Sequence, residues 1–331
     1  MSSTDAPERQ GPATVDSIVP GADLAGADLA EADLRGVDLS RCDLTDANLE
    51  GADLTEARLT GAVLVRARMA GARLERSQLL GADLTDADLT EVKGSGAGFG
   101  GARLVGAGLF GADLADSTFS HADLTGADLR VANLRGARLR EATLVHTDLS
   151  RADLVGADLT HADVDHASFH EADLSESRLK GLRGYVTADW IGVDVFGADY
   201  TGAYLARRAI IDQNYLYEFR NQSRLHAFIY RVWWLTSDCG RSFLRWGLWT
   251  AVVGLLFALI YTYVPVDFGA NPTPLSPIYF SVVTLTTLGY GDVLPTSAGA
   301  QIVVMVQVVM GYVMLGGLLS IFAAKMGRRA E

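Results

Sequence analysis

The chain has 331 residues and a net charge of −12, and 49% of its residues are hydrophobic. That length is enough for about two domains. Its two cysteines, Cys42 and Cys239, belong to no metal-like spacing, and residues 1–20 are polar without the apolar core of a signal peptide, which argues against a disulfide-rich secreted protein and favours free thiols.

Charge is distributed unevenly along the chain. Residues 205–331 contain 10 Lys and Arg against 6 Asp and Glu, a net of +4, which leaves −16 for residues 1–204. An acidic half and a slightly basic, apolar half indicate two different environments. The polar residues 1–20 are predicted to be a disordered tail.

A five-residue repeat begins at Gly21 with the units GADLA, GADLA, EADLR, GVDLS and RCDLT. A large apolar residue recurs at Leu24, Leu29 and onward, and the residue two positions before it is small, usually Ala. The frame holds to Lys180 and resumes one residue out of step after an irregular patch at 181–186. A period of five fits neither an α-helix nor a strand. It predicts a stacked solenoid that bends every five residues, with Leu and Ala inside.

These units resemble the pentapeptide-repeat family, whose pattern is A-(D/N)-L-x-x. The resemblance covers residues 21–206 and implies a right-handed quadrilateral β-helix with four units in each coil. It would contain about nine coils and measure about 40 Å at the usual spacing of stacked strands. We expect this domain to be cytoplasmic, because nothing in the sequence directs it across a membrane.

Two features interrupt the regular pattern. Aromatic residues take the central position, which requires neighbouring coils to adjust, at Phe99, Phe119, Phe169 and Trp190. The unit at 91–95 has Gly94 in place of the large residue. It is predicted to loosen one side of a coil, and a functional loop is the alternative.

The exposed Asp column, which begins at Asp23 and Asp28, allows two interpretations. Asp side chains can hydrogen-bond turn amides and keep the rod soluble. Alternatively, the rod mimics the charge of DNA, as the resemblance implies for some members of the family. A local basic patch, expected to be a solvated face rather than an intersubunit contact, comprises Arg58, Arg66, Arg68, Arg73 and Arg76. No metal-ligand spacing is shared by His121, His146, His161, His166 and His170.

Residues 207–240 leave the repeat and are predicted to connect two domains. Apolar residues from Leu225 to Leu235 recur at helical spacing, and basic residues such as Arg224 and Arg231 lie on another face. This pattern predicts an amphipathic helix in the membrane interface. The alternative is a soluble helix that caps the last coil of the β-helix.

Residues 241–331 contain two long apolar runs. The runs at 246–264 and 302–324 are each long enough to cross the hydrocarbon core of a bilayer. Residues 278–286 are too short to span it and are predicted to form a re-entrant pore helix. The second half is therefore predicted to be an all-α membrane pore domain with two transmembrane helices.

The stretch TTLGYGD at 286–292 follows the predicted pore helix. Glycine tolerates backbone angles that other residues resist, so this loop can be extended with its carbonyls pointing one way. It resembles the selectivity filter of the potassium-channel family, whose usual TVGYG is TLGYG here. Position 288 supplies a backbone carbonyl, so its change from Val to Leu has little bearing on K⁺ binding. A Gly-rich turn between two buried helices is the alternative.

The resemblance assigns roles to individual residues. Four chains would surround K⁺ with rings of oxygens. The implied filter residues are Thr287, Leu288, Gly289, Tyr290 and Gly291. The residues implied to support the filter are Thr286, Asp292, Tyr279 and Phe280.

Further positions bear on bracing and opening of the pore. Gly311 lies where the inner helix of the family commonly bends, and packing together with Gly316 and Gly317 is the alternative. Val283 stands where some bacterial members have Glu, which implies a different brace behind the filter. Candidates for the inner mouth, at helical spacing, are Leu315, Leu319 and Ala323.

Basic residues predict the topology. Arg241 and Arg245 precede the first span and Lys325, Arg328 and Arg329 follow the second, while the loop between the spans has no Lys or Arg. The positive-inside rule places both termini in the cytoplasm and the filter loop outside. We expect a multi-pass protein of a bacterial inner membrane. Neither span has an Arg-rich stripe, so voltage sensing is not expected.

These observations predict a homotetramer in a lipid bilayer that is not an enzyme and conducts K⁺ as its permeant ion. No nucleic acid partner is expected, and the sequence identifies no cytoplasmic regulator. Two alternatives stay open. One is a repeat domain that binds partners or mimics DNA, with the spans as its membrane anchor. The other is a non-selective cation channel.

Overall fold

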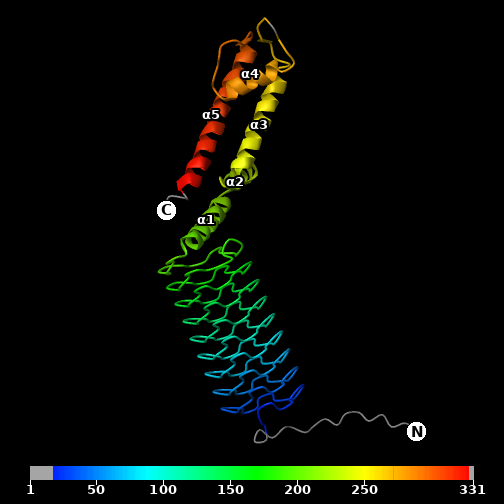
Figure 1. Cartoon of the computed structure of the whole chain (residues 1–331), viewed down its shortest axis with the longest axis vertical. Helices are drawn as coiled ribbons and strands as arrows, with labels where there is room; N and C mark the ends of the chain where they lie inside the picture. Colours follow the sequence, from blue (N-terminus) through cyan, green and yellow to red (C-terminus); the bar gives the residue numbers. More distant parts are fainter. Residues whose placement is uncertain (1–17, 271, 328–331) are drawn as a thin grey trace, which may run out of the picture. The chain divides into compact units, whose positions relative to one another are not determined.

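The computed structural model describes residues 18–270 and 272–327, except for the side chains of 324–327. It consists of two compact units, divided between Tyr217 and Glu218 (Figure 1). The tail expected at 1–20 lies outside the described residues apart from 18–20.

The first unit is a β-helix that advances by 20 residues in each coil. Short backbone hydrogen bonds join successive coils, as from Leu24 N to Asp43 O at 2.7 Å. Figure 1 shows these coils stacked one on the next. Parallel bridges run along four sides, beginning with Asp23 to Asp43, Asp28 to Asn48, Asp33 to Asp53 and Asp38 to Arg58. The β-helix predicted from the repeat is confirmed.

Each side of a coil ends at a residue with left-handed backbone. Gly21, Gly26 and Glu31 have φ angles of 81°, 65° and 56°. A positive φ turns the chain sharply, which glycine adopts at no steric cost. The residues between these corners bury the repeat's apolar side chains, and Leu34 and Ala47 are both 0% exposed.

The Asp column forms hydrogen bonds within its own turns. Asp23 Oδ1 accepts from the N–H of Ala25 at 3.1 Å, and Asp43 Oδ1 accepts from the N–H of Thr45 at 3.0 Å. These contacts agree with the first of the two interpretations, in which the Asp side chains hydrogen-bond the amides of their own turns. Four of the five arginines of the basic patch, all except Arg58, form ion pairs with carboxylates: Arg66 with Asp46, Arg68 with Glu50, Arg73 with Asp53 and Glu75, and Arg76 with Glu56.

The large central residues stack on each other in adjacent coils. The rings of Phe99 and Phe119 lie 4.7 Å apart, and those of Phe169 and Trp190 lie 4.4 Å apart. The second pair is 21 residues apart in sequence, because the bridges change from a spacing of 20 to one of 21 after Arg183. The one-residue shift of the repeat frame is thus an extra residue in one turn, and the bridges between coils continue beyond it.

The expectation that unit 91–95 loosens its coil is wrong. Gly94 N donates to Asp113 O at 2.7 Å, and Lys93 forms bridges to the coils on both sides. A Cβ built on Gly94 would lie 3.0 Å from Leu114 Cδ2, so a neighbouring side chain occupies the space of the missing one. The glycine therefore accommodates Leu114 and does not open the coil.

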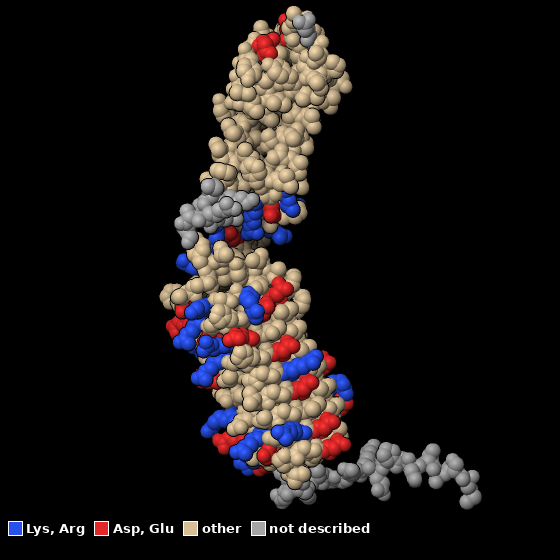
Figure 2. Space-filling view, in the orientation of Figure 1, with Lys and Arg blue, Asp and Glu red and all other residues tan. Residues whose placement is uncertain are grey.

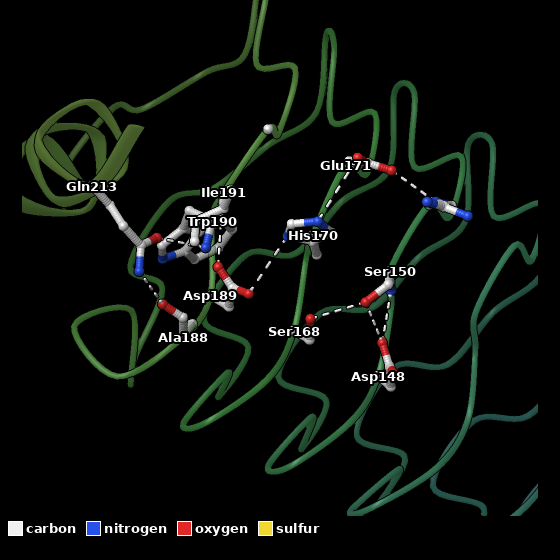
Figure 3. A network of polar contacts seen from close by, with 12 residues as sticks. Asp148, Ser150, Ser168, His170, Glu171, Ala188, Asp189, Trp190, Ile191 and Gln213 are labelled. Atoms are coloured by element: carbon white, nitrogen blue, oxygen red, sulfur yellow. Dashed lines mark hydrogen bonds and ion pairs between the residues drawn. The ribbon is translucent and has the colours of Figure 1, made fainter. Parts of the chain in front are cut away.

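Helix α1 (Tyr204–Asn221) begins where the last coil ends, slightly before the expected limit at 206. Gln213 Oε1 accepts from Trp190 N at 2.6 Å, and Asn214 Oδ1 accepts from Gly192 N at 2.8 Å. Asn214 Nδ2 donates to Trp190 O at 2.8 Å. Figure 3 shows Gln213 beside Trp190 and Ala188. These two amides satisfy backbone groups that would otherwise end the ladder unpaired.

The same end of the β-helix carries a chain of polar contacts on its surface (Figure 3). His170 lies between Glu171 and Asp189, at 3.8 Å and 3.7 Å. Asp189 Oδ1 also accepts from Ile191 N at 3.0 Å. The described residues contain no group of three or more His, Cys, Asp or Glu that could hold a metal ion.

The second unit is helical. Its helices are α2 (Arg224–Ser237), α3 (Phe243–Ile260), α4 (Ser276–Leu285) and α5 (Ala298–Gly327). A two-residue strand β1 (Val266–Asp267) pairs antiparallel with β2 (Leu294–Pro295). Helix α4 packs against both α3 and α5 (Figure 1). The core they share includes Val253, Phe257, Tyr261, Phe280, Leu285 and Val293.

The helix bounds differ from the predicted ones for local reasons. Helix α3 begins at Phe243 rather than 246, because Ser242 Oγ caps it by accepting from Arg245 N at 3.2 Å. Helix α4 begins at Ser276 rather than 278, with a proline in its first turn, where the missing N–H costs nothing. Helix α5 begins at Ala298 rather than 302, after Ser297.

The connector holds two helices where one was expected. The predicted amphipathic segment forms α2, whose N-cap Ser223 accepts from His226 N. Helix α1 was not foreseen as a helix, although a cap for the last coil was one of the two alternatives for this region. Helix α1 takes the capping role of the second alternative, and α2 is a separate amphipathic helix.

Candidate ion pore

The sign of φ alternates along the loop that follows α4. Thr287, Gly289 and Gly291 have φ angles of 57°, 51° and 76°, whereas Leu288 and Tyr290 are not among the residues with positive φ. Residues with positive φ, which glycine adopts freely, allow the carbonyls on either side of them to point to one side of a loop. The carbonyls of 287–290 can therefore line one side of the loop.

Thr287 is the unusual member of this loop. A left-handed conformation is uncommon for a non-glycine residue and most unfavourable for a β-branched one. At Thr287 it belongs to the C-terminal motif of α4, in which the residue after the C-cap is left-handed. Here, Thr287 N donates to Thr284 O at 3.1 Å and Leu288 N donates to Val283 O at 3.0 Å. These two bonds fix the start of the loop to the last turn of α4.

The expected supporting residues lie around this loop. Tyr279 donates its hydroxyl to Asp292 Oδ2 at 2.8 Å, which joins α4 to the far end of the loop. Phe280 is 7% exposed and its ring lies 4.7 Å from that of Tyr261. Thr286 Oγ1 donates back to Val282 O at 2.7 Å, so this hydroxyl serves the helix end.

The loop itself is exposed in the single chain. Leu288 and Tyr290 are 59% and 67% exposed, although they are large and apolar or aromatic. Leu315, Leu319 and Ala323 on α5 are exposed as well. Exposed apolar side chains on a loop and a helix of this kind are typical of protein or membrane contacts. The exposed face of the loop is therefore available to other copies of the chain.

Gly311, the candidate hinge, is a site of close packing. A Cβ built on it would collide with the carbonyl oxygen of Leu285 and lie 3.1 Å from its carbonyl carbon. The absence of a side chain thus lets α5 touch the last residue of α4. Gly317 is close to the indole ring of Trp246, whereas Gly316 has nothing within 4 Å.

The buried polar side chains of this unit were not predicted from the sequence. Gln307 on α5 is 0% exposed and contacts Tyr261 and Ser281. A single amide in the middle of an otherwise apolar span was the signal, because polar groups in such spans are rare and functional. Trp246, at the start of the first predicted span, donates its indole N–H to Met314 O at 2.8 Å.

Helices α3 and α5 are long and apolar enough to cross a membrane, over Phe243–Ile260 and Ala298–Ala323. Only 22% and 11% of these windows are buried. Figure 2 shows a surface with few charges over these helices, whereas the β-helix surface mixes Lys and Arg with Asp and Glu. Apolar side chains that face outward on both helices indicate a lipid or protein environment.

Comparison with known families matches both halves of the chain. Pentapeptide repeats match at residues 22–61, 52–90, 95–130, 132–170 and 152–183, and an ion channel family matches at residues 248–328. No curated protein matches the chain. The chain thus contains pentapeptide repeats and an ion-channel domain, and it is a membrane protein.

Solved structures similar to the chain are pentapeptide repeat proteins. HetL, involved in heterocyst differentiation regulation in the cyanobacterium Nostoc sp. strain PCC 7120, is 33% identical over 56% of this chain and 85% of its own, with a TM-score of 0.22. A protein of the Arabidopsis thaliana thylakoid lumen is 32% identical over 30% and 68%, with a TM-score of 0.29. QnrB1, a plasmid-mediated fluoroquinolone resistance protein, is 21% identical over 56% and 96%, with a TM-score of 0.34.

Proposed function

Since one chain carries pentapeptide repeats and an ion-channel domain, we propose that it forms a homotetrameric, potassium-selective channel. The observation that carries the proposal is the alternating backbone of 287–291 between two apolar helices. One chain supplies one such loop, whereas a ring of oxygens around an ion needs four. The exposed loop and the exposed α5 side chains supply surface for this assembly.

The mechanism is passive conduction. Rings formed by the carbonyls of Thr287, Leu288, Gly289 and Tyr290, with the Thr287 hydroxyl at the inner end, replace the water shell of K⁺. Repulsion between neighbouring ions keeps exit fast. The hydrogen bond from Tyr279 to Asp292 holds the outer end of the loop against α4. Leu288 contributes its carbonyl, so its longer side chain lies outside the ion path.

We place the channel in a bacterial inner membrane with both termini in the cytoplasm. The support is the basic residues that flank the two spans and the absence of Lys and Arg from the loop between them. Helix α2 then lies in the cytoplasmic interface, because Leu225, Phe228 and Val232 on it are 64%, 63% and 44% exposed. Arg224 and Arg231 on the same helix would face the lipid headgroups.

The experiment is ion flux through purified full-length protein in liposomes. With a K⁺ gradient, we expect K⁺ and Rb⁺ flux and little Na⁺ flux. A matched Gly289→Ala variant should abolish the flux, because Gly289 has a φ of 51° that alanine resists. Equal Na⁺ and K⁺ permeability of the wild type would instead establish a non-selective cation channel.

A second candidate function is a membrane-anchored repeat domain that binds a partner. It is favoured by the pairing of acidic and basic side chains over the β-helix surface, which is a mixed surface suited to protein contacts. Absence of any K⁺ or Rb⁺ flux from folded tetramers would support this function and contradict the channel.

The repeat domain is proposed to regulate or assemble the channel. The test is deletion of residues 1–200. An unchanged open probability together with unchanged assembly would exclude both roles.

A further inference from the structure

A continuous series of hydrogen bonds runs through the interior of the helical unit. Tyr261 donates its hydroxyl to Gln307 Oε1 at 2.6 Å. Gln307 Nε2 donates to the carbonyl oxygen of Ser281 at 2.9 Å and to its Oγ at 2.7 Å. Ser281 Oγ in turn donates to Gly254 O at 2.6 Å. Every polar atom of the three side chains therefore has a partner of the right kind.

The orientation of the Gln307 amide is fixed by these partners. The Ser281 carbonyl can only accept, so the atom that faces it must be the donating Nε2. The opposite oxygen then accepts from Tyr261. Gln307 and Ser281 are 0% exposed and Tyr261 is 1% exposed, so no water replaces a lost bond.

The chain of bonds joins three elements that are distant in sequence. Tyr261 directly follows α3, Ser281 lies in α4 and Gln307 lies in α5. Gly254 on α3 completes the link from the other side. Helix α4 is consequently held by hydrogen bonds toward both long helices at the same residue, Ser281.

Few other polar contacts hold α4 along its length. The side chains of Phe280 and Leu285 belong to the apolar core of this unit, and the side chain of Val283 is apolar and buried. The loop in which φ alternates in sign begins at Thr287, two residues after the last residue of α4, and its first amides donate to the carbonyls of Val283 and Thr284. A displacement of α4 would therefore move the oxygens of the loop directly.

We propose that Gln307 is a positioning residue for ion selectivity, which fixes α4 between the two spans through Tyr261 and Ser281. The inference rests on the proposed channel function. Ion selectivity depends on the placement of the loop oxygens, and a shift of the helix that carries them changes their spacing. An unpaired polar group inside a membrane costs several kcal/mol, so these hydrogen bonds are expected to persist.

The experiment is the reversal potential of the reconstituted full-length channel under opposed Na⁺ and K⁺ gradients. Gln307→Met keeps the length of the side chain and removes its hydrogen bonds. Gln301→Met is the matched control, because Gln301 lies on the same helix and is exposed. Tyr261→Phe and Ser281→Ala are made in the wild type and in the Gln307→Met background.

We expect Gln307→Met to raise the Na⁺ to K⁺ permeability ratio by roughly three- to tenfold, since single intramembrane hydrogen bonds change an equilibrium constant by factors of this order. Gln301→Met should leave the ratio unchanged. Tyr261→Phe should raise the ratio in the wild type and have little further effect beside Gln307→Met, because the shared bond is already lost.

Three results would overturn the inference. One is an unchanged permeability ratio in Gln307→Met with lowered thermal stability, which would make the residue structural only. Another is additive effects of Tyr261→Phe and Gln307→Met. If Gln307→Met does not fold, the milder Tyr261→Phe variant is decisive. An unchanged Na⁺ to K⁺ permeability ratio in that variant would contradict the positioning role of Gln307. Absence of selective flux in the wild type would refute the proposed function instead, so the two failures are distinguishable.

Discussion

The indole Nε1 of Trp246 donates a hydrogen bond to the carbonyl oxygen of Met314 at 2.8 Å, and the ring lies against Gly317. This contact ties the start of α3 to the second half of α5. The Met314 carbonyl would otherwise accept only from within its own helix. The small residue at 317 is what permits the ring to approach so closely.

Gly317→Ala should push Trp246 away from α5. We expect a loss of about 1–3 kcal/mol of stability, the usual cost of overpacking. Gly316→Ala is the control, because a Cβ there meets nothing within 4 Å and alanine favours a helix. Thermal unfolding of the detergent-solubilised protein, followed by circular dichroism, measures both. Equal stability of the two variants would contradict the packing described for Trp246.

Gly311→Ala distinguishes a packing glycine from a hinge. Its Cβ would collide with the backbone of Leu285, which cannot move aside as a flexible side chain can. We expect destabilisation of about 1–3 kcal/mol or more, together with a disturbed pore loop. If Gly311 serves only as a bend, the variant should keep wild-type thermal stability and ion selectivity while its open probability changes. Combined unfolding and flux measurements separate these outcomes.

The amides of Gln213 and Asn214 should protect the last coil of the β-helix. Asn214→Leu removes the partners of Gly192 N and Trp190 O, which join this edge of the coil to α1. We expect faster amide hydrogen exchange in residues 188–192, measured by mass spectrometry. Gln222→Leu, at an exposed position between α1 and α2, is the control and should leave this exchange unchanged.

Acid should weaken the β-helix through its paired carboxylates. The hydrogen bond from Arg35 holds the pKa of Asp33 at about 2, below the ordinary 3.8. The hydrogen bond from Arg66 lowers the pKa of Asp46, and that from Thr45 lowers the pKa of Asp43. A lowered folded-state pKa contributes stability above the unfolded value and loses it as pH falls through the folded value.

The pH window follows from these directions. Thermal unfolding should be constant above pH 3.8 as far as these groups are concerned, and the unfolding temperature should fall between pH 3.8 and about pH 2. Asp46→Asn should reduce this dependence. A β-helix that becomes more stable in that range would contradict the assigned hydrogen bonds.

Much of the architecture could be predicted because it follows from repeats and apolar runs that are visible in short stretches of sequence. The spacing of Leu24 and Leu29 specifies a coil of five-residue sides, and the slip near Gly184 predicts the change of bridge spacing. The apolar runs predict α3 and α5 by length alone. These features depend on local sequence, where a single pattern decides the structure.

The rest depends on contacts between distant residues. Gln213 and Asn214 look like ordinary polar residues of a helix until the backbone edge at Trp190 lies beside them. Gly94 gave no sign that Leu114 would fill its place. Gln307 is an amide within an apolar span, but its partner Ser281 lies 26 positions away in a separate helix, so the sequence did not reveal the pair. Pairings of this kind are set by tertiary packing rather than by periodicity.

Up to Arg183, successive coils of the repeat domain are offset by a constant 20 residues. Removal of 20 consecutive residues would shorten it by one step of about 4.8 Å and return every later residue to the side it occupied before. Removal of only five would keep the ladders but shift the exit of the chain by one side of the coil. Gain or loss of whole coils in evolution can therefore change the length of the repeat domain alone. Gain or loss of single five-residue units also changes the side from which the chain leaves it.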